Sequence, residues 1–150
     1  MRAVLQRVDR ASVKVDFEIT GKINQGLLIL LGIESEDRQE DIDWLVKKIV
    51  NMRIFPDENS KMNSSLLDIK GEALVVSQFT LHASTKKGNR PSFTKAAAPD
   101  FARTMYEQFI SKLQENITTG VQTGKFGGDM SVELVNNGPV TINIDSKDKV

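Results

Sequence analysis

The 150-residue sequence contains no cysteine and only one histidine, His82. The absence of cysteine excludes a disulfide framework, thiolate metal sites and every mechanism that uses a cysteine nucleophile. With a single histidine, and with carboxylates scattered over faces expected to be solvated, the chain offers no cluster of metal ligands. We therefore expect neither a bound metal nor a cofactor.

Net charge and long apolar runs are also lacking. Twenty basic side chains balance twenty acidic ones, which argues against a protein that coats nucleic acid through a basic surface, although a local basic patch is compatible with this balance. The longest apolar stretch, residues 26–33, falls well short of the roughly 20 residues that span a bilayer. The first residues run into strand-like sequence rather than a signal peptide. We expect one soluble domain of residues 1–150 in the cytoplasm.

What the chain does contain is a succession of strand patterns. Alternating residues and short apolar runs bounded by turn residues predict eight strands. They span residues 2–9, 11–15, 19–23, 26–33, 72–81, 120–123, 130–135 and 139–144. Residues 26–33 are apolar on both faces, which is typical of a central strand.

Two further segments place apolar residues at helical spacing. The first, residues 38–52, begins next to Asp37, which with Glu40 has the spacing of a capping box. The second begins at Pro99 and carries an apolar stripe, which consists of Phe101, Met105, Phe109 and Leu113. The elements together favour an α+β fold, with a mostly antiparallel curved sheet or open barrel packed by two main helices.

The end of the predicted strand 72–81 carries candidate site residues. Side chains alternate along a strand, so Gln78 and Thr80 should share one face and Ser77 and Phe79 the other. Polar groups at the end of a buried strand need partners or a ligand. A strand whose end becomes exposed would explain the pattern equally well.

Thr80 invites the hypothesis of a hydroxyl nucleophile, which needs an adjacent base. The only histidine, His82, lies at the mouth of a predicted loop over residues 82–98, with no carboxylate beside it to orient the ring. We therefore interpret His82 as a surface histidine. A Ser-His-Asp triad is poorly supported.

Two loop segments are open to more than one interpretation. Lys86, Lys87 and Arg90 could clamp phosphate or could simply be solvated. Gly138-Pro139 could be a plain turn, or a cis bond that rigidly aims the flanking carbonyls so that they exclude a substrate group.

Taken together, four collinear motifs resemble those of the bacterial and eukaryotic D-aminoacyl-tRNA deacylase family. They are MRAVLQRV at residues 1–8, SQFTL at 77–81, KG and RPSF within 87–93, and NGPVT at 137–141. The resemblance covers nearly the whole chain. It implies a homodimer that hydrolyses the ester between a D-amino acid, or glycine, and the terminal adenosine of tRNA.

The resemblance also implies roles for the candidate residues. The floor of the pocket would consist of Ser77, Gln78, Phe79 and Thr80, which would position the ester and stabilise the oxyanion. The 2′-hydroxyl of the tRNA, rather than a protein base, would assist the reaction. The loop of one subunit would enter the partner's pocket as a chiral filter, and it would consist of Gly138, Pro139, Val140 and Thr141. Arg7 would brace this loop, and tRNA would be bound by Lys86, Lys87 and Arg90.

Two functions of other classes remain as alternatives. An RNA-binding module without catalysis could use Phe79 or Phe93 as a stacking platform. A hydrolase of small esters or nucleotides would act without tRNA.

The tail of residues 146–150 lies beyond the matched motifs and is expected to fray.

Overall fold

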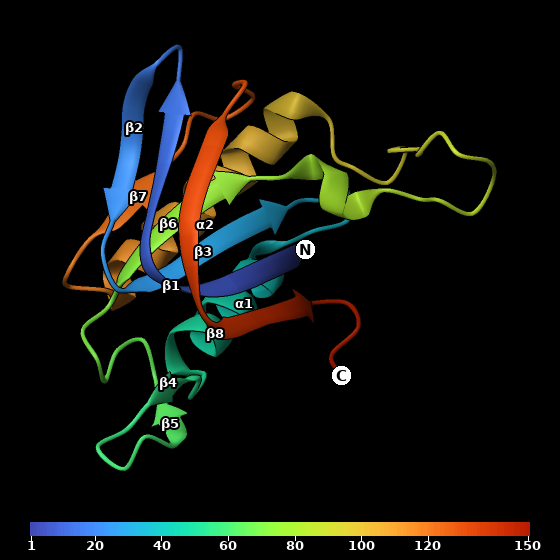
Figure 1. The fold of residues 1–150 in the computed structure, drawn as a ribbon. Coiled ribbons are helices and arrows are strands. Elements are labelled where there is room, and N and C mark those ends of the chain that lie inside the picture. Colours follow the sequence, from blue (N-terminus) through green and yellow to red (C-terminus); the bar gives the residue numbers. More distant parts are fainter.

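The computed structural model describes residues 1–150, and its main feature is a six-stranded mixed sheet with two helices against one face (Figure 1). The strands are β1 (Arg2–Val15), β2 (Glu18–Ile23), β3 (Gly26–Gly32), β6 (Glu72–Ser77), β7 (Val121–Thr123) and β8 (Ser131–Asp145). Their order is β2-β1-β3-β6-β7, with β8 paired to β1. β2 also approaches β7, so the sheet curls into an open barrel. The predicted α+β fold with two main helices is confirmed.

The connections explain why the sheet is mixed. β1 pairs antiparallel with β2, β3 and β8, whereas β3–β6 and β6–β7 are parallel. Parallel neighbours need a crossover, and the two helices supply it. Helix α1 (Gln39–Asn51) connects β3 towards β6, and α2 (Pro99–Asn116) connects β6 towards β7. Between them, β4 (Phe55–Pro56) and β5 (Met62–Ser64) form a separate two-stranded sheet.

The apolar runs pack where their spacing predicts. β3 is a central strand, as predicted, because Leu27 and Ile29 face the main core under the helices while Leu28 belongs to a second cluster. In α2, Met105, Phe109 and Leu113 of the stripe are buried. Phe101 departs from the prediction, because 39% of it is exposed at the beginning of the helix.

Three predicted strand boundaries were wrong. Residues 2–15 form one continuous strand, since β1 bends from its pairing with β3 to its pairing with β2. Residues 131–145 likewise form one strand that contains a bulge opposite Arg7. The strand predicted at 72–81 ends at Ser77, and a 3-10 turn, η1 (Phe79–His82), replaces its last residues.

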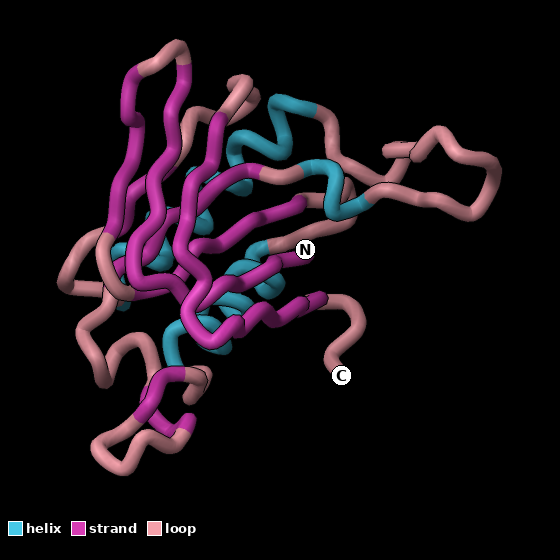
Figure 2. Tube along the Cα trace, in the orientation of Figure 1, coloured by secondary structure: helices cyan, strands magenta, loops and turns pink.

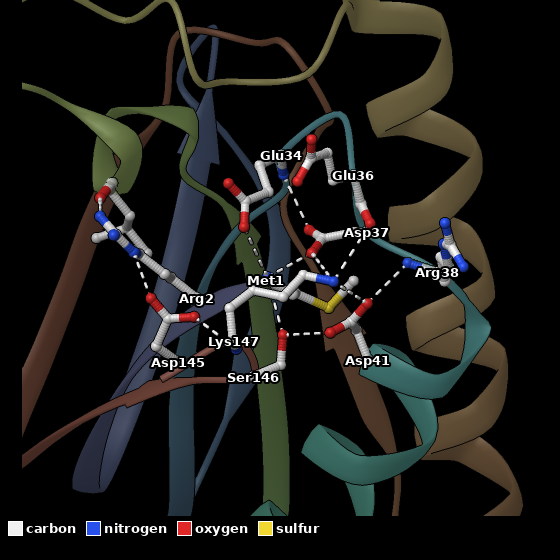
Figure 3. A network of polar contacts seen from close by, with 11 residues as sticks. Met1, Arg2, Glu34, Glu36, Asp37, Arg38, Asp41, Asp145, Ser146 and Lys147 are labelled. Atoms are coloured by element: carbon white, nitrogen blue, oxygen red, sulfur yellow. Dashed lines mark hydrogen bonds and ion pairs between the residues drawn. The ribbon is translucent and has the colours of Figure 1, made fainter. Parts of the chain in front are cut away.

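A polar network ties the beginning of the chain to α1 and to the C-terminal segment (Figure 3). The amino group of Met1 is buried, donates to Asp37 Oδ1 and donates to Ser146 Oγ at 3.0 Å. Ser146 in turn donates to Asp41 Oδ1 at 2.6 Å, and Lys147 Nζ donates to Asp41 Oδ2 at 2.8 Å.

The network corrects two predictions. Asp37 does not cap the helix, because its carboxylate binds the Met1 amino group; the carboxylate of Asp41 accepts the bond from the Arg38 amide instead. The expected fraying of residues 146–150 does not begin at Ser146, which is buried and hydrogen-bonded. Neither helix is long and apolar enough to cross a membrane.

Candidate active site

The segment that follows β6 turns sharply and presents the first group of candidate residues. Gln78 N donates to Leu31 O at 2.7 Å, which continues the pairing with β3 by one residue. The chain then coils into η1, and Arg2 Nη1 donates to Leu81 O at 3.0 Å from the neighbouring strand end. The turn is thus held by backbone bonds at its start and by an arginine at its end.

A close approach between backbones explains why η1 can lie over β3. A Cβ atom on Gly32 would stand 2.9 Å from Gln78 O and 3.1 Å from His82 Cδ2. Any larger residue at this position would therefore push η1 outward. The glycine at the end of β3 is part of what positions the site.

Gln78 and Thr80 come together, but not for the reason predicted. At the start of η1 their side chains are bonded directly, with Gln78 Nε2 donating to Thr80 Oγ1. Strand alternation plays no part, since the strand has already ended. Ser77 is half-buried beside them, and Phe79 projects with 58% of its surface exposed.

The interpretation of His82 as a surface histidine was wrong. The side chain is 2% exposed, and neither ring nitrogen has a hydrogen-bond partner. No carboxylate therefore orients the ring, and no bond connects it to Thr80. His82 serves as a core residue under η1 rather than as part of a triad.

A cleft of about 470 Å³ opens beside Ser77, Gln78 and Phe79. Its lining is mostly apolar and comes from β3, the end of β6, the start of η1, the start of α2 and the chain leading into the first residues of β8. The lining residues are Leu31, Ile33, Val76, Ser77, Gln78, Phe79, Ala97, Pro99, Ala102, Phe126, Gly127, Gly128, Met130 and Val132. A partly open apolar cleft with a few polar groups at one edge is the usual form of a small-ligand site.

One wall of this cleft was missed by the sequence reasoning. Phe126 lies under Arg103, whose Cζ is 5.1 Å from the ring centroid, and against Tyr106, at 5.4 Å between centroids. Tyr106 donates to Val75 O at 3.0 Å, and burial raises the pKa of Tyr106 to about 12. The signal available in the sequence was the glycine-rich GKFGG at residues 124–128.

The second group of candidate residues lies in the bulge of β8. The Gly138–Pro139 bond is cis, and Gly138 has a φ of +130°, a conformation that residues with a side chain rarely adopt. Arg7 Nε donates to Asn137 O at 3.0 Å, immediately before this bond. Val140 is half-buried, and Thr141 is exposed.

The structure does not bring the two groups together within one chain. None of the residues of the β8 bulge lines the cleft. In Figure 1 the bend of β8 lies near β4 and α1, whereas η1 lies towards the opposite side of the sheet. The functional roles predicted for Gly138, Pro139, Val140 and Thr141 remain predictions.

The third group, Lys86, Lys87 and Arg90, lies on the loop between η1 and α2, which projects from the body (Figure 2). All three are exposed, and none forms an ion pair. The loop is closed by a bridge between Ser84 and Ser92. Beyond the bridge, Phe93 meets Phe79 edge to face at 5.2 Å, which connects the basic loop to the rim of the cleft.

The acidic and histidine side chains form no group of three that could hold a metal ion. The site therefore consists of a turn with polar side chains, an apolar cleft and a basic loop. Such an arrangement can bind and orient a ligand with an apolar part and a phosphate-bearing part.

Comparison with known proteins identifies the family of the chain. A family model described as D-Tyr-tRNA(Tyr) deacylase matches residues 4–145. The D-aminoacyl-tRNA deacylases of Christiangramia forsetii and Flavobacterium johnsoniae are 62% and 59% identical to the chain, each over 99% of both sequences.

Solved structures give the same result for the fold. A structure titled c-Myc DNA Unwinding Element Binding Protein superposes with a TM-score of 0.92 at 42% identity, covering 97% of this chain and 98% of the other. A probable eukaryotic D-amino acid tRNA deacylase has a TM-score of 0.81 at 18% identity, covering 95% and 97%, which shows the fold alone. The resemblance seen in the sequence is confirmed: the chain belongs to the D-Tyr-tRNA(Tyr) deacylase family and is a hydrolase that acts on aminoacyl-tRNA.

Proposed function

We propose that the enzyme is a chiral proofreader that hydrolyses D-aminoacyl-tRNA, and Gly-tRNA as well, while it spares L-aminoacyl-tRNA. The observation that carries this proposal is the cleft beside Ser77, Gln78 and Phe79, whose edge offers hydrogen-bonding groups while the rest is apolar. The chain would act as a single catalytic domain in the cytoplasm, where translation supplies its substrate.

The proposed reaction does not need a side chain of the protein to act as a base. Water attacks the ester carbonyl carbon, the bond to the ribose oxygen breaks, and that oxygen takes up a proton to give free tRNA and the amino acid. The terminal 2′-hydroxyl of the tRNA assists the attack, while Ser77, Gln78, Phe79 and Thr80 position the ester and stabilise the oxyanion. Two observations support this division: Thr80 Oγ1 is bonded to an amide rather than to a base, and His82 is buried without a partner.

Chiral selection would work by rejection. The carbonyls flanking Gly138–Pro139, held by Arg7 and followed by Val140 and Thr141, would occupy the space that an L side chain requires. Within one chain this segment lies away from the cleft, so only a second copy could bring it there; we therefore propose a homodimer in which each loop enters the partner's site. Glycine, which has no side chain, would pass the filter.

The basic loop would hold the tRNA. Lys86, Lys87 and Arg90 are exposed cations without acidic partners, beside the aromatic pair at the rim of the cleft. Because the chain has no net charge, attraction to RNA must be local, and binding should weaken steeply with salt.

The test is the rate of ester release from matched D-tyrosyl-, L-tyrosyl- and glycyl-tRNA at low salt. We expect rapid release from the D- and glycyl-esters and background release from the L-ester. Equal release of D- and L-esters would remove the chiral filter. Binding of RNA without release of any ester would instead favour a binding module, and activity that persists after removal of the terminal 2′-hydroxyl would contradict the assisted mechanism.

A further inference from the structure

We infer that Asp9 and Asn137 are positioning residues that act through Arg7 to fix the Gly138–Pro139 segment for chiral selection. The inference rests on the proposed function, because it concerns groups that lie behind the proposed filter and touch no substrate. In addition to the four residues of the proposed filter on β8, it assigns a role to a series of hydrogen-bonded side chains that begins on β1.

The β8 bulge cannot be positioned by the sheet alone. Gln6 pairs with Thr141 and Val8 with Asn136, so four residues of β8, 137–140, stand opposite Arg7 without a regular ladder partner. In a bulge of this kind the backbone loses the bonds that fix a strand. Side-chain hydrogen bonds must therefore set where Gly138 lies.

On the far side of the bulge, Asn136 provides these bonds locally. Its Oδ1 accepts from Val140 N at 3.1 Å, and its Nδ2 donates to Thr141 Oγ1 at 3.1 Å. The segment after Pro139 is thus held from within β8. The segment before Gly138 has no such local brace and depends on β1.

Arg7 supplies that connection. Its Nε donates to Asn137 O at 3.0 Å, its Nη2 donates to Asn137 Oδ1 at 3.2 Å, and its Nη1 donates to Ile54 O at 2.7 Å. The guanidinium also lies against the next residue, because a Cβ on Gly138 would be 3.0 Å from Nη2. Arg7 therefore connects the bulge to the segment before β4.

Asp9 determines how Asn137 receives this arginine. Asn137 Nδ2 donates to Asp9 Oδ1 at 2.7 Å. A carboxylate only accepts hydrogen bonds and a guanidinium only donates them, so the amide fits between Asp9 and Arg7 in one orientation alone. The carboxylate thus fixes the amide, the amide and its backbone carbonyl fix the guanidinium, and the guanidinium lies against Gly138.

The test exchanges the two side chains. Asn137→Asp keeps the size of the residue but sets two carboxylates face to face, and we expect the ratio of D- to L-tyrosyl-ester release to fall roughly fivefold. Adding Asp9→Asn restores a donor opposite the carboxylate introduced at position 137, whose second oxygen still accepts from Arg7. The double variant should therefore recover the ratio of the original protein.

Asp9→Asn alone should change the ratio less than about twofold, because its amide oxygen can still accept from Asn137. Asn59→Asp is the matched control: it makes the same chemical change on the exposed turn between β4 and β5 and should leave the ratio unchanged. Thermal unfolding of each variant identifies any effect that comes from stability alone.

An unchanged ratio in Asn137→Asp, or a double variant no better than that single variant, would overturn the inference. A fall in unfolding temperature with no change in the ratio would overturn it too, since it would show a merely structural pair. Failure of the proposed function is distinguishable, because the original protein would then show no preference for the D-ester before any substitution is made.

Discussion

Thr80 has a hydrogen-bond donor beside it, Gln78 Nε2, but no base. If the tRNA 2′-hydroxyl assists the reaction, Thr80→Ala removes one orienting bond and should lower the rate of D-ester release by less than about tenfold. Single-turnover hydrolysis of D-tyrosyl-tRNA measures this directly. A loss of about 10²–10⁴-fold, typical of a removed acid–base group, would instead make Thr80 part of the chemistry.

Within the proposed filter, Gly138 has the backbone conformation that is least compatible with a side chain. Its φ of +130° disfavours any side chain, and a Cβ would stand 2.9 Å from Val140 Cγ2. Gly138→Ala should therefore shift the bulge and lower the ratio of D- to L-ester release by at least about fivefold.

Gly120 offers a matched control for this substitution. It has nearly the same φ, +132°, with open space around the position of a Cβ, and it lies between α2 and β7. Gly120→Ala should strain the backbone without altering the ratio of D- to L-ester release. If both alanine variants changed the ratio alike, or neither did, Gly138 would have no special part in selection.

Among the elements, the loop between η1 and α2 carries the clearest electrostatic prediction. Replacing Lys86, Lys87 and Arg90 with alanine should raise KM for aminoacyl-tRNA about tenfold at low salt, leave kcat unchanged and flatten the salt dependence of binding. The variant in which Lys47, Arg53 and Lys61 become alanine removes the same number of exposed positive charges from α1 and from the segments on either side of β4. Equal effects of the two triple variants would exclude a specific tRNA contact by the loop.

Periodicity in the sequence predicted the strands and helices but not the residue at which β6 ends. The run that ends at Ser77 and the residues after it have continuous strand character, yet η1 begins at Phe79 because Gly32 allows the turn to pack onto β3. This long-range contact leaves no local pattern. The same packing buries His82, which the sequence placed at the surface.

Candidate site residues could be named where the chain carries a motif, but not where packing between segments builds the cleft. The segments 77–81 and 137–141 stood out from their residues, whereas the brace from Arg7 was implied by the family resemblance. Phe126 was missed, because its position depends on side-chain contacts with Arg103 and Tyr106 of α2, which leave no local pattern around residue 126. The contact between Asp9 and Asn137 spans 128 residues and likewise has no local signal.

For the molecule as a whole, the network around Asp41 predicts sensitivity to acid. Burial acts to raise the pKa of Asp41, but bonds from Lys147, Ser146 and the Arg38 amide outweigh it and lower the pKa from 3.8 to about 2. A carboxyl whose pKa is depressed by folding stabilises the native state above its unfolded pKa. That stability is lost as pH falls from about 4 to about 2.

Asp41→Asn should therefore lower the free energy of unfolding by about 2 kcal/mol at pH 6 and by much less near pH 2.5. Urea unfolding at the two pH values measures the difference. Asp43→Asn, on the exposed side of the same helix, should show no such pH dependence. A constant difference between the Asp41 variant and the original protein would contradict the role of the network.

The central claim is that a second copy completes the active site. Ser77→Trp fills the cleft of its own chain, whereas Gly138→Trp would place an indole in the cleft of the partner, so each homodimer should be inactive. The most direct measurement is D-tyrosyl-tRNA hydrolysis by a purified heterodimer of the two variants, with different tags placed after the exposed Val150. One intact cleft would then meet one intact loop, and we predict about half the activity of the original protein. A heterodimer as inactive as its parents would contradict a site shared between subunits.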